Sequence, residues 1–348
     1  MKRIRSPLVM LRQMGWVKGA LIVFIVLTLA GCGSLPNQAQ LPGMAVLFAQ
    51  QGQYGRENLV VARYNAHGQR QGKWISVGPL GLVAQTEIMA SHAGTLWITT
   101  GHSVKQITQD YHVKTLWSSP KNSAILSVAY VEGHLWVAVE RIGGRFVDIY
   151  LQQHGHFADV LRGPLAITTL YPAFHALGIL RVWPNRAQVE LWRPHKAPKE
   201  LTVHAIPQGT MVLTKTTGYL PITAGLNKFG IATMALGSGK MVPHLSFYHR
   251  TKEAIIEVIP SNPPYGMTVQ GVVPLSRSPS SRTVLRKWPH PLAATVTTAI
   301  ESPASWMIIL DGPSQGLWFN PRLDRFGPAF HVVAPQGEFP RAVVPWSG

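Results

Sequence analysis

Apolar residues occur along most of the chain in short runs. The runs are rich in Val, Ile, Leu, Thr and Trp, and each is about four to eight residues long. Gly, Pro, Asn, His and Ser separate one run from the next, and these residues favour turns. Runs of this length with turn residues between them are typical of β-strands, so the pattern predicts an all-β protein.

One of these runs has clear copies. Gly94-Thr-Leu-Trp-Ile-Thr-Thr and Gly133-His-Leu-Trp-Val-Ala-Val align residue for residue, and Trp97 and Trp136 are 39 residues apart. Three later segments look like further copies and begin at Ala176, Lys228 and Ser305. Because the copies are largely apolar, we expect each on an inner or second strand whose two faces are both covered.

A second repeated marker is an aromatic residue at a strand end, followed by a polar turn. Tyr64 and Tyr150 are 86 residues apart, Tyr150 and Trp192 are 42 apart, and Phe247 is a further example. A period of about 40–45 residues with four strands per unit is typical of a β-propeller. In that fold small twisted sheets pack face to face around an axis, which covers both faces of each sheet.

The prediction is therefore a β-propeller over residues 44–346. This range holds 303 residues, or about seven four-stranded blades, and six blades with one oversized is the alternative. Residues 218–226 and 276–281 are expected to be loop insertions, and residues 267–285 to form a weak blade.

The first 31 residues have the order of a secretory signal. An apolar run over residues 20–30 ends in the motif Leu29-Ala30-Gly31-Cys32, and a basic leader precedes it. The motif resembles that of bacterial lipoproteins, which implies that Cys32 is lipidated after cleavage. The apolar stretch is shorter than the ~20 residues that a membrane-spanning helix needs, and an uncleaved or ordinarily cleaved signal is the alternative. The leader cations are Lys2, Arg3, Arg5, Arg12 and Lys18.

This interpretation divides the chain into three parts. Residues 1–31 are the signal peptide, residues 32–43 a flexible tether from the lipidated cysteine, and residues 44–346 the propeller. Gly33 and Ser34 differ from the aspartate that retains lipoproteins at an inner membrane. The predicted location is the extracytoplasmic side of the cell membrane, or of the outer membrane in a bacterium with two membranes.

The copies at Gly94 and Gly133 resemble the short repeats of bacterial sensor and lipoprotein propellers. The chain lacks Trp-Asp repeat ends, Tyr-Trp-Thr-Asp repeats, the sialidase box and the quinoprotein tryptophan signature, so no specific propeller family is matched. Its anchor and architecture are similar to those of the propeller lipoprotein of the outer-membrane barrel-assembly machine. That resemblance implies a non-catalytic scaffold.

Charge narrows the range of partners. The chain has 32 Lys+Arg against 15 Asp+Glu and a formal net charge of +17, which becomes +12 without the leader. A positive body near a membrane attracts anionic lipids or anionic wall polymers. A nucleic-acid partner is not favoured because the dense basic patches, such as residues 282–287 and 195–199, are short. An acidic habitat is an alternative origin of the low acid content.

His154, His156 and Asp159 are candidate metal ligands. They offer imidazole and carboxylate groups within six residues, which are ligand types that metals such as zinc accept. The competing interpretation is structural, because His154-Gly155 repeats His67-Gly68 and both suit a hairpin turn that needs positive φ.

The other candidate chemistry is equally sparse. Glu87, Glu132, Glu140 and Asp311 lie beside predicted inner strands or their turns and could supply a pair of glycosidase carboxylates. Acids in such places more often hydrogen-bond the backbone or pair with Arg. The chain has no Gly-x-Ser-x-Gly elbow, P-loop or dinucleotide fingerprint, and no cofactor is predicted.

The sequence therefore predicts a membrane-anchored extracytoplasmic scaffold without catalytic activity. Its partners would be the lipid bilayer, through acylated Cys32, and a protein or an anionic envelope polymer. The alternative is an extracellular hydrolase or lyase that acts on a glycan or peptide in the propeller channel.

Overall fold

The computed structural model separates the chain into two compact units, residues 1–41 and 42–348. The residues whose structure it describes are 41, 43–51, 57–79, 89–92, 94–193, 196–223, 229–236, 243–247, 254–259, 264–275, 286–289, 296–301, 307–311, 315–321, 323–335 and 338–346. Within these ranges every regular element is a β-strand, and the strands form seven antiparallel sheets. The predicted all-β class is confirmed. Over the same ranges no helix is long and apolar enough to cross a membrane.

Sheet 1 joins the two ends of the described chain. Its order is β29-β1-β2-β3, so the last strand lies beside the first. The strands are Phe339–Pro345, Met44–Gln51, Glu57–Tyr64 and Arg70–Pro79.

Sheets 2 to 4 each consist of four consecutive strands. Sheet 2 contains β4 Met89–His92, β5 Thr95–Thr99, β6 Ser103–Ile107 and β7 Val113–Ser118. Sheet 3 contains β8 Ser123–Val131, β9 His134–Arg141, β10 Phe146–Gln153 and β11 His156–Pro164. Sheet 4 contains β12 Ile167–Ala173, β13 Ala176–Trp183, β14 Arg186–Trp192 and β15 Lys199–Val203.

Sheets 5 and 6 have short or interrupted strands, whereas the strands of sheet 7 are as long as those of sheet 2. Sheet 5 contains β16 Ile206–Pro207, β17 Val212–Leu213, β18 Thr217–Thr223, β19 Phe229–Ala235 and β20 Pro243–Phe247. Sheet 6 contains β21 Glu257–Ile259, β22 Tyr265–Met267, β23 Gly271–Pro274 and β24 Arg286–Lys287. Sheet 7 contains β25 Val296–Glu301, β26 Met307–Asp311, β27 Gln315–Asn320 and β28 Arg325–His331.

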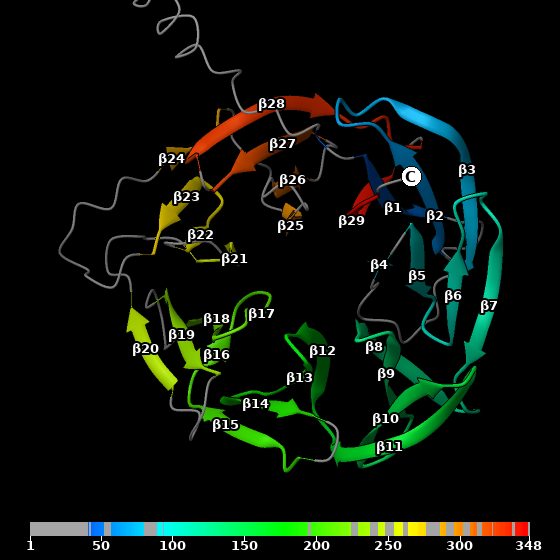
Figure 1. Ribbon diagram of the computed structural model, residues 1–348, viewed down its shortest axis with the longest axis vertical. Coiled ribbons are helices and arrows are strands. Elements are labelled where there is room, and N and C mark those ends of the chain that lie inside the picture. The colour runs from blue at the N-terminus through cyan, green and yellow to red at the C-terminus, as the bar shows by residue number, and fades with distance from the viewer. Residues whose placement is uncertain are drawn as a thin grey trace, which may run out of the picture. The chain divides into compact units, whose positions relative to one another are not determined.

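Within residues 42–348 the sheets follow one another around a common centre, as Figure 1 shows. Contacts run from the inner strands of each sheet to the first strand of the next, with β18, the second strand of sheet 5, contacting β21 of sheet 6, and β25 of sheet 7 contacts β29 of sheet 1. The outer strands β3, β7, β11 and β28 run along the circumference (Figure 1). The arrangement is β-propeller-like, as the repeats predict.

The hydrophobic core lies between neighbouring sheets. One cluster of buried residues joins sheets 1 and 2, and others join sheets 2 and 3, sheets 3 and 4, and sheets 4 and 5. Burial on both faces explains why the second and third strands are nearly continuous in apolar residues. A hydrogen bond also joins sheets 3 and 4, because the backbone amide of Leu170 on β12 donates to Ser127 Oγ on β8 at 2.8 Å.

Trp97 and Trp136 occupy equivalent positions, as their repeat predicts. Both lie on the second strand of their sheet, and both stand opposite an alanine of the first strand. Both are buried. Trp97 stacks on Tyr130 of the next sheet with ring centroids 4.6 Å apart, and Trp136 meets Trp192 of the sheet after its own at 4.8 Å.

The predicted organisation of sheet 5 was wrong by one strand. The segment that begins at Lys228 forms β19, the third strand, and Phe247 ends the fourth strand, β20. Residues 217–223, where a loop insertion was predicted, form the second strand, β18. Residues 276–281, the other predicted insertion, lie outside the described residues.

Pro221 explains why the sequence predicts a loop where β18 forms. Proline has no N–H to donate, so it usually argues against a central strand. Here Pro221 lies opposite the interruption between β16 and β17, where its missing donor costs no ladder bond. Its carbonyl accepts a hydrogen bond from the amide of Gln208 at 3.0 Å. A proline is therefore tolerated in the second strand of sheet 5, because the first strand is interrupted opposite it.

Candidate binding surface

Each sheet of the ring has two ends. Because neighbouring strands are antiparallel, the turns from first to second strand and from third to fourth strand lie at one end. We call it the Met44 end, because Met44 pairs with Tyr64 just before such a turn. The turns from second to third strand, and the links to the next sheet, lie at the other end. We call it the Phe146 end, because Phe146 begins β10 directly after such a turn.

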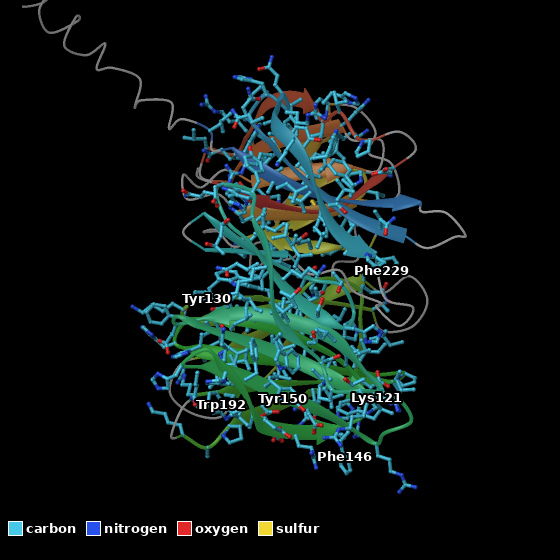
Figure 2. All side chains as sticks on the ribbon, turned by 90° about the vertical axis from the view of Figure 1, so that its right-hand side faces the viewer. Lys121, Tyr130, Phe146, Tyr150, Trp192 and Phe229 are labelled. Atoms are coloured by element: carbon cyan, nitrogen blue, oxygen red, sulfur yellow. The ribbon has the colours of Figure 1, made fainter. Side chains whose placement is uncertain are left out.

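The two ends face opposite ways. Figure 2 shows Tyr130 on β8 and Trp192 at the end of β14 on the left side of the molecule. Lys121, which lies between β7 and β8, and Phe146 are on the right side. A partner that covers one end therefore leaves the other end free.

The three candidate metal ligands lie on an outer hairpin of sheet 3 and are exposed. His154 and Gly155 form the turn between β10 and β11 with φ of 48° and 83°, as the structural interpretation predicts. His156 begins β11, and Asp159 on the same strand lies 3.5 Å from Arg162 Nη2. Over the described residues, no group of three or more His, Cys, Asp or Glu side chains is placed to hold a metal ion.

The candidate carboxylates do not form a pair where they are described. Glu132 is in the β8–β9 turn and bonds to Nδ1 of His175, which lies in the β12–β13 turn of the next sheet. Glu140 lies near the other end of β9, about 25 Å away at ~3.3 Å per residue, whereas glycosidase carboxylates are ~5–10 Å apart. Asp311 ends β26, while Glu87 and Cys32 lie outside the described residues.

The Phe146 end carries exposed apolar side chains. Ile142 is 56% exposed, Phe146 51%, Leu165 43% and Ile167 63%. We call these four residues the apolar patch. Single exposed apolar residues are ordinary on protein surfaces, but a group of them indicates a binding surface.

Arginines border the patch and are fixed by one buried acid. Asp148 is 2% exposed, and its two carboxylate oxygens accept hydrogen bonds from Arg141 Nε at 3.1 Å and Arg162 Nε at 2.6 Å. The Arg162 guanidinium lies 5.9 Å from the centre of the Phe146 ring, within the range of a cation–π contact. The hydrogen bond to Asp148 raises the pKa of Arg162, so this side chain stays cationic.

The sequence contains a local signal for this surface that catalytic motifs do not capture. Arg141-Ile142-Gly143-Gly144-Arg145-Phe146 places two apolar residues and two cations around a glycine turn. Leu165 and Ile167 give no such signal, because they belong to a run that reads as an ordinary core strand. Leu165 lies just before β12, and Ile167 begins β12 on the face opposite to that of the buried Thr168.

No protein-family model and no curated protein matches the sequence. Solved structures are nevertheless similar in fold. A functionally unknown protein from Desulfotomaculum acetoxidans DSM 771 is 9% identical, with a TM-score of 0.54 over 86% of this chain and 98% of that protein.

Two peptidases are also similar over part of their length. A puromycin-hydrolyzing peptidase of Mycobacterium tuberculosis is 9% identical, with a TM-score of 0.55 over 85% of this chain and 52% of the peptidase. A prolyl endopeptidase is 11% identical, with a TM-score of 0.52 over 89% of this chain and 53% of the enzyme. The chain spans about half the length of these enzymes. At such identities the likeness shows a β-propeller-like fold alone.

Proposed function

We propose that this protein is a lipid-anchored extracytoplasmic scaffold whose β-propeller binds an envelope partner without catalysing a reaction. The observation that carries the proposal is the apolar patch, which leaves Ile142, Phe146, Leu165 and Ile167 exposed at one end of a packed ring. Rigid rings of sheets present such groups without the entropic cost of ordering them on binding.

The proposed propeller has seven blades. Each of the seven described sheets supplies one blade, and β29 completes the first blade beside β1. Pairing of the last strand with the first favours seven blades over six, because every blade then has a strand in each of its four places. The interrupted first strand of sheet 5 fills one place with β16 and β17 together.

The proposed anchor is the acylated thiol of Cys32. Two or three acyl chains bind a bilayer stably because each buried methylene contributes ~0.8 kcal/mol. Residues 33–43 would then link the anchor to Met44 at the start of β1, with a reach of up to about 40 Å when extended. The proposed location is the extracytoplasmic face of the cell membrane or of the outer membrane.

Replacement of the cysteine tests the anchor. We expect Cys32→Ala to abolish lipidation and to release the protein from the membrane fraction after a high-salt wash, because the acyl chains have no other attachment site in this proposal. Fractionation and mass measurement of the mature protein report the two effects. The control is Ser34→Ala, which leaves the motif intact and should stay anchored. A Cys32→Ala protein that is still lipidated would contradict the proposal.

A further inference from the structure

We infer that the apolar patch docks an acidic, amphipathic segment of a protein partner. The inference rests on the proposed scaffold function and gives it a site and a partner chemistry. Acidic side chains of the segment would meet the arginines and lysine around the patch, and its apolar side chains would cover Ile142, Phe146, Leu165 and Ile167.

The four apolar residues belong to adjoining segments of backbone. Ile142 and Phe146 flank the turn between β9 and β10. Phe146 stands opposite Pro164 in the β10–β11 ladder, and the amide of Leu165 donates to the carbonyl of Arg145 at 2.9 Å. One short segment could therefore contact Ile142, Phe146 and Leu165 at once, which is what an anchor-and-pocket interface requires, and Ile167 follows two residues after Leu165 at the start of β12.

Cations dominate the border of the patch. Arg141, Arg145 and Arg162 lie on the strands and the turn that carry it, and Lys121 lies at the same end of the molecule (Figure 2). Three acids lie on the same strands: Asp148 is buried and shared by Arg141 and Arg162, Asp159 lies 3.5 Å from Arg162 Nη2, and Glu140 on β9 is partly buried. With Lys121 the four cations still outnumber them. A partner with carboxylates would complement this charge, whereas a second copy of this basic chain would not.

The arginines are held in place before any partner arrives. Arg141 and Arg162 each donate a hydrogen bond to Asp148, and each bond fixes the long side chain that makes it. These side chains therefore lose less rotamer freedom when a partner binds. Strand alternation puts Arg141, Phe146, Asp148 and Arg162 on one face of sheet 3. The basic and aromatic groups are therefore presented together.

The patch lies at the end of the propeller opposite to its link with the tether. The described chain begins at the Met44 end, where the amide of Trp346 donates to the carbonyl of Gly43 at 2.9 Å. A body attached through Gly43 presents its opposite end, which carries the patch, away from the point of attachment. A surface in that place is accessible to another envelope protein.

Peptide binding to the full-length lipoprotein in neutral phosphatidylcholine nanodiscs tests the inference. The probe is a fluorescent peptide of alternating Glu and Leu, and its counterpart has Lys in place of every Glu. We expect the acidic peptide to bind at least tenfold more tightly than the basic one, and its affinity to fall at least tenfold in Ile142→Ser/Phe146→Ser and in Arg145→Glu. Matched controls on outer strand β7, Val113→Ser and Lys114→Glu, should change affinity less than twofold.

Three results would overturn the inference. They are equal binding of the two peptides, unchanged binding by the patch variants, and displacement of the acidic peptide by anionic phosphatidylglycerol vesicles, which would assign the patch to membranes. Circular dichroism and thermal unfolding establish that each variant folds. Fractionation of Cys32→Ala tests the lipid anchor independently of the patch, so failure of the docking inference and failure of the proposed anchor are distinguishable.

Discussion

Individual tryptophans connect the repeat in the sequence to the packing between sheets. Trp97 and Trp136 each contact an aromatic ring of a neighbouring sheet, so each fills space that two sheets share. We expect truncation of either one to Ala to lower the free energy of unfolding by about 3–5 kcal/mol, because a cavity remains between the sheets. Urea unfolding followed by circular dichroism measures the loss.

Trp183 is the matched control for these two substitutions. It ends β13 and is only partly buried, with Arg186 over its ring at 4.9 Å. Trp183→Ala should therefore cost about 1 kcal/mol, the size of an exposed cation–π contact. Equal losses at all three positions would show that the repeat register does not determine which tryptophans support the core.

Glu338 is a residue whose burial has a consequence for pH. It precedes β29 and is buried, and among the residues that the structure describes neither of its carboxylate oxygens has a hydrogen-bond partner. Burial raises the pKa of this carboxyl, so the folded protein holds the proton to a higher pH than the unfolded chain does. Stability contributed by this group must then fall as the pH rises from the ordinary value of ~4.3 through the raised value, and stay level above it.

The corresponding substitution removes the charge and keeps the shape. We expect Glu338→Gln to raise the free energy of unfolding at pH 8, by about 1.4 kcal/mol for each unit by which burial raises the pKa of the carboxyl, because a neutral amide avoids burial of a charge, and we expect the gain to vanish near pH 3. Urea unfolding at the two pH values measures it. Glu200→Gln, at an exposed position on β15, should show no such dependence. A gain that is the same at both pH values would argue against ionisation of Glu338 as its cause.

Whole elements were predictable from the sequence wherever the repeat keeps its rhythm. Sheets 2 to 4 follow it, because their strands are complete and their turns carry Gly or His with positive φ, as at Glu132-Gly133 and His154-Gly155. Sheet 5 departs from it because β18 holds Gly218 and Pro221, which read as a loop until their neighbours are known. A Cβ at Gly218 would lie 2.9 Å from the side-chain ends of Leu213 and Met234, so both side chains would have to shift to accept it.

The candidate surface was less predictable than the fold. Motif searches look for catalytic groups, but the apolar patch consists of common residues whose meaning depends on exposure. Ile167 and Leu170 belong to the same apolar run, yet Ile167 is exposed and Leu170 is buried. The two residues are three positions apart on β12, so strand alternation puts them on opposite faces, and only the face of Leu170 packs in the core between sheets 3 and 4.

Strand β29 is the element on which closure of the ring depends. It pairs with β1 along residues 44–49. Val343 and Val344 of β29 are buried, and so is Trp346 directly after it. Burial of three such side chains is worth about 5–9 kcal/mol, which is comparable to the whole stability of a domain. We expect removal of residues 339–348 to abolish cooperative unfolding and to cause aggregation through the unpaired edge of β1. Thermal unfolding and size-exclusion chromatography measure the two effects.

A shorter truncation serves as the control. Removal of residues 347–348 leaves every residue of β29 and Trp346 in place, so that protein should unfold at the temperature of the full chain. Trp346 also has a cation–π contact with Arg63, whose guanidinium lies 3.7 Å from the centre of the Trp346 ring. The same guanidinium lies 4.5 Å from the centre of the ring of Tyr111, which belongs to the neighbouring sheet. If the protein without residues 339–348 remained monomeric and cooperative, closure by the last strand would not be what stabilises the ring.

At the scale of the whole molecule, charge adds an attraction that does not depend on the patch. The formal net charge is +17 for the chain and +12 without its first 31 residues. Such a charge attracts anionic lipids and polymers over distances set by the Debye length, which falls from ~10 Å at 0.1 M salt to ~3 Å at 1 M. This attraction and the docking of one segment at the patch therefore differ in their response to salt and to single substitutions.

Binding to an immobilised anionic polymer separates these contributions. We expect the protein to be retained on dextran sulfate at 0.1 M NaCl and released before 1 M, with no retention on uncharged dextran, because screening removes the long-range attraction. Ile142→Ser/Phe146→Ser should leave this retention unchanged, since it removes no charge.

EDTA should alter neither retention nor stability if the protein is a scaffold that needs no metal. Metal-dependent turnover of a glycan or peptide would instead favour a hydrolase or lyase, with His154, His156 and Asp159 the first residues to replace. Retention that persists at 1 M salt would exclude net charge as the basis of the interaction.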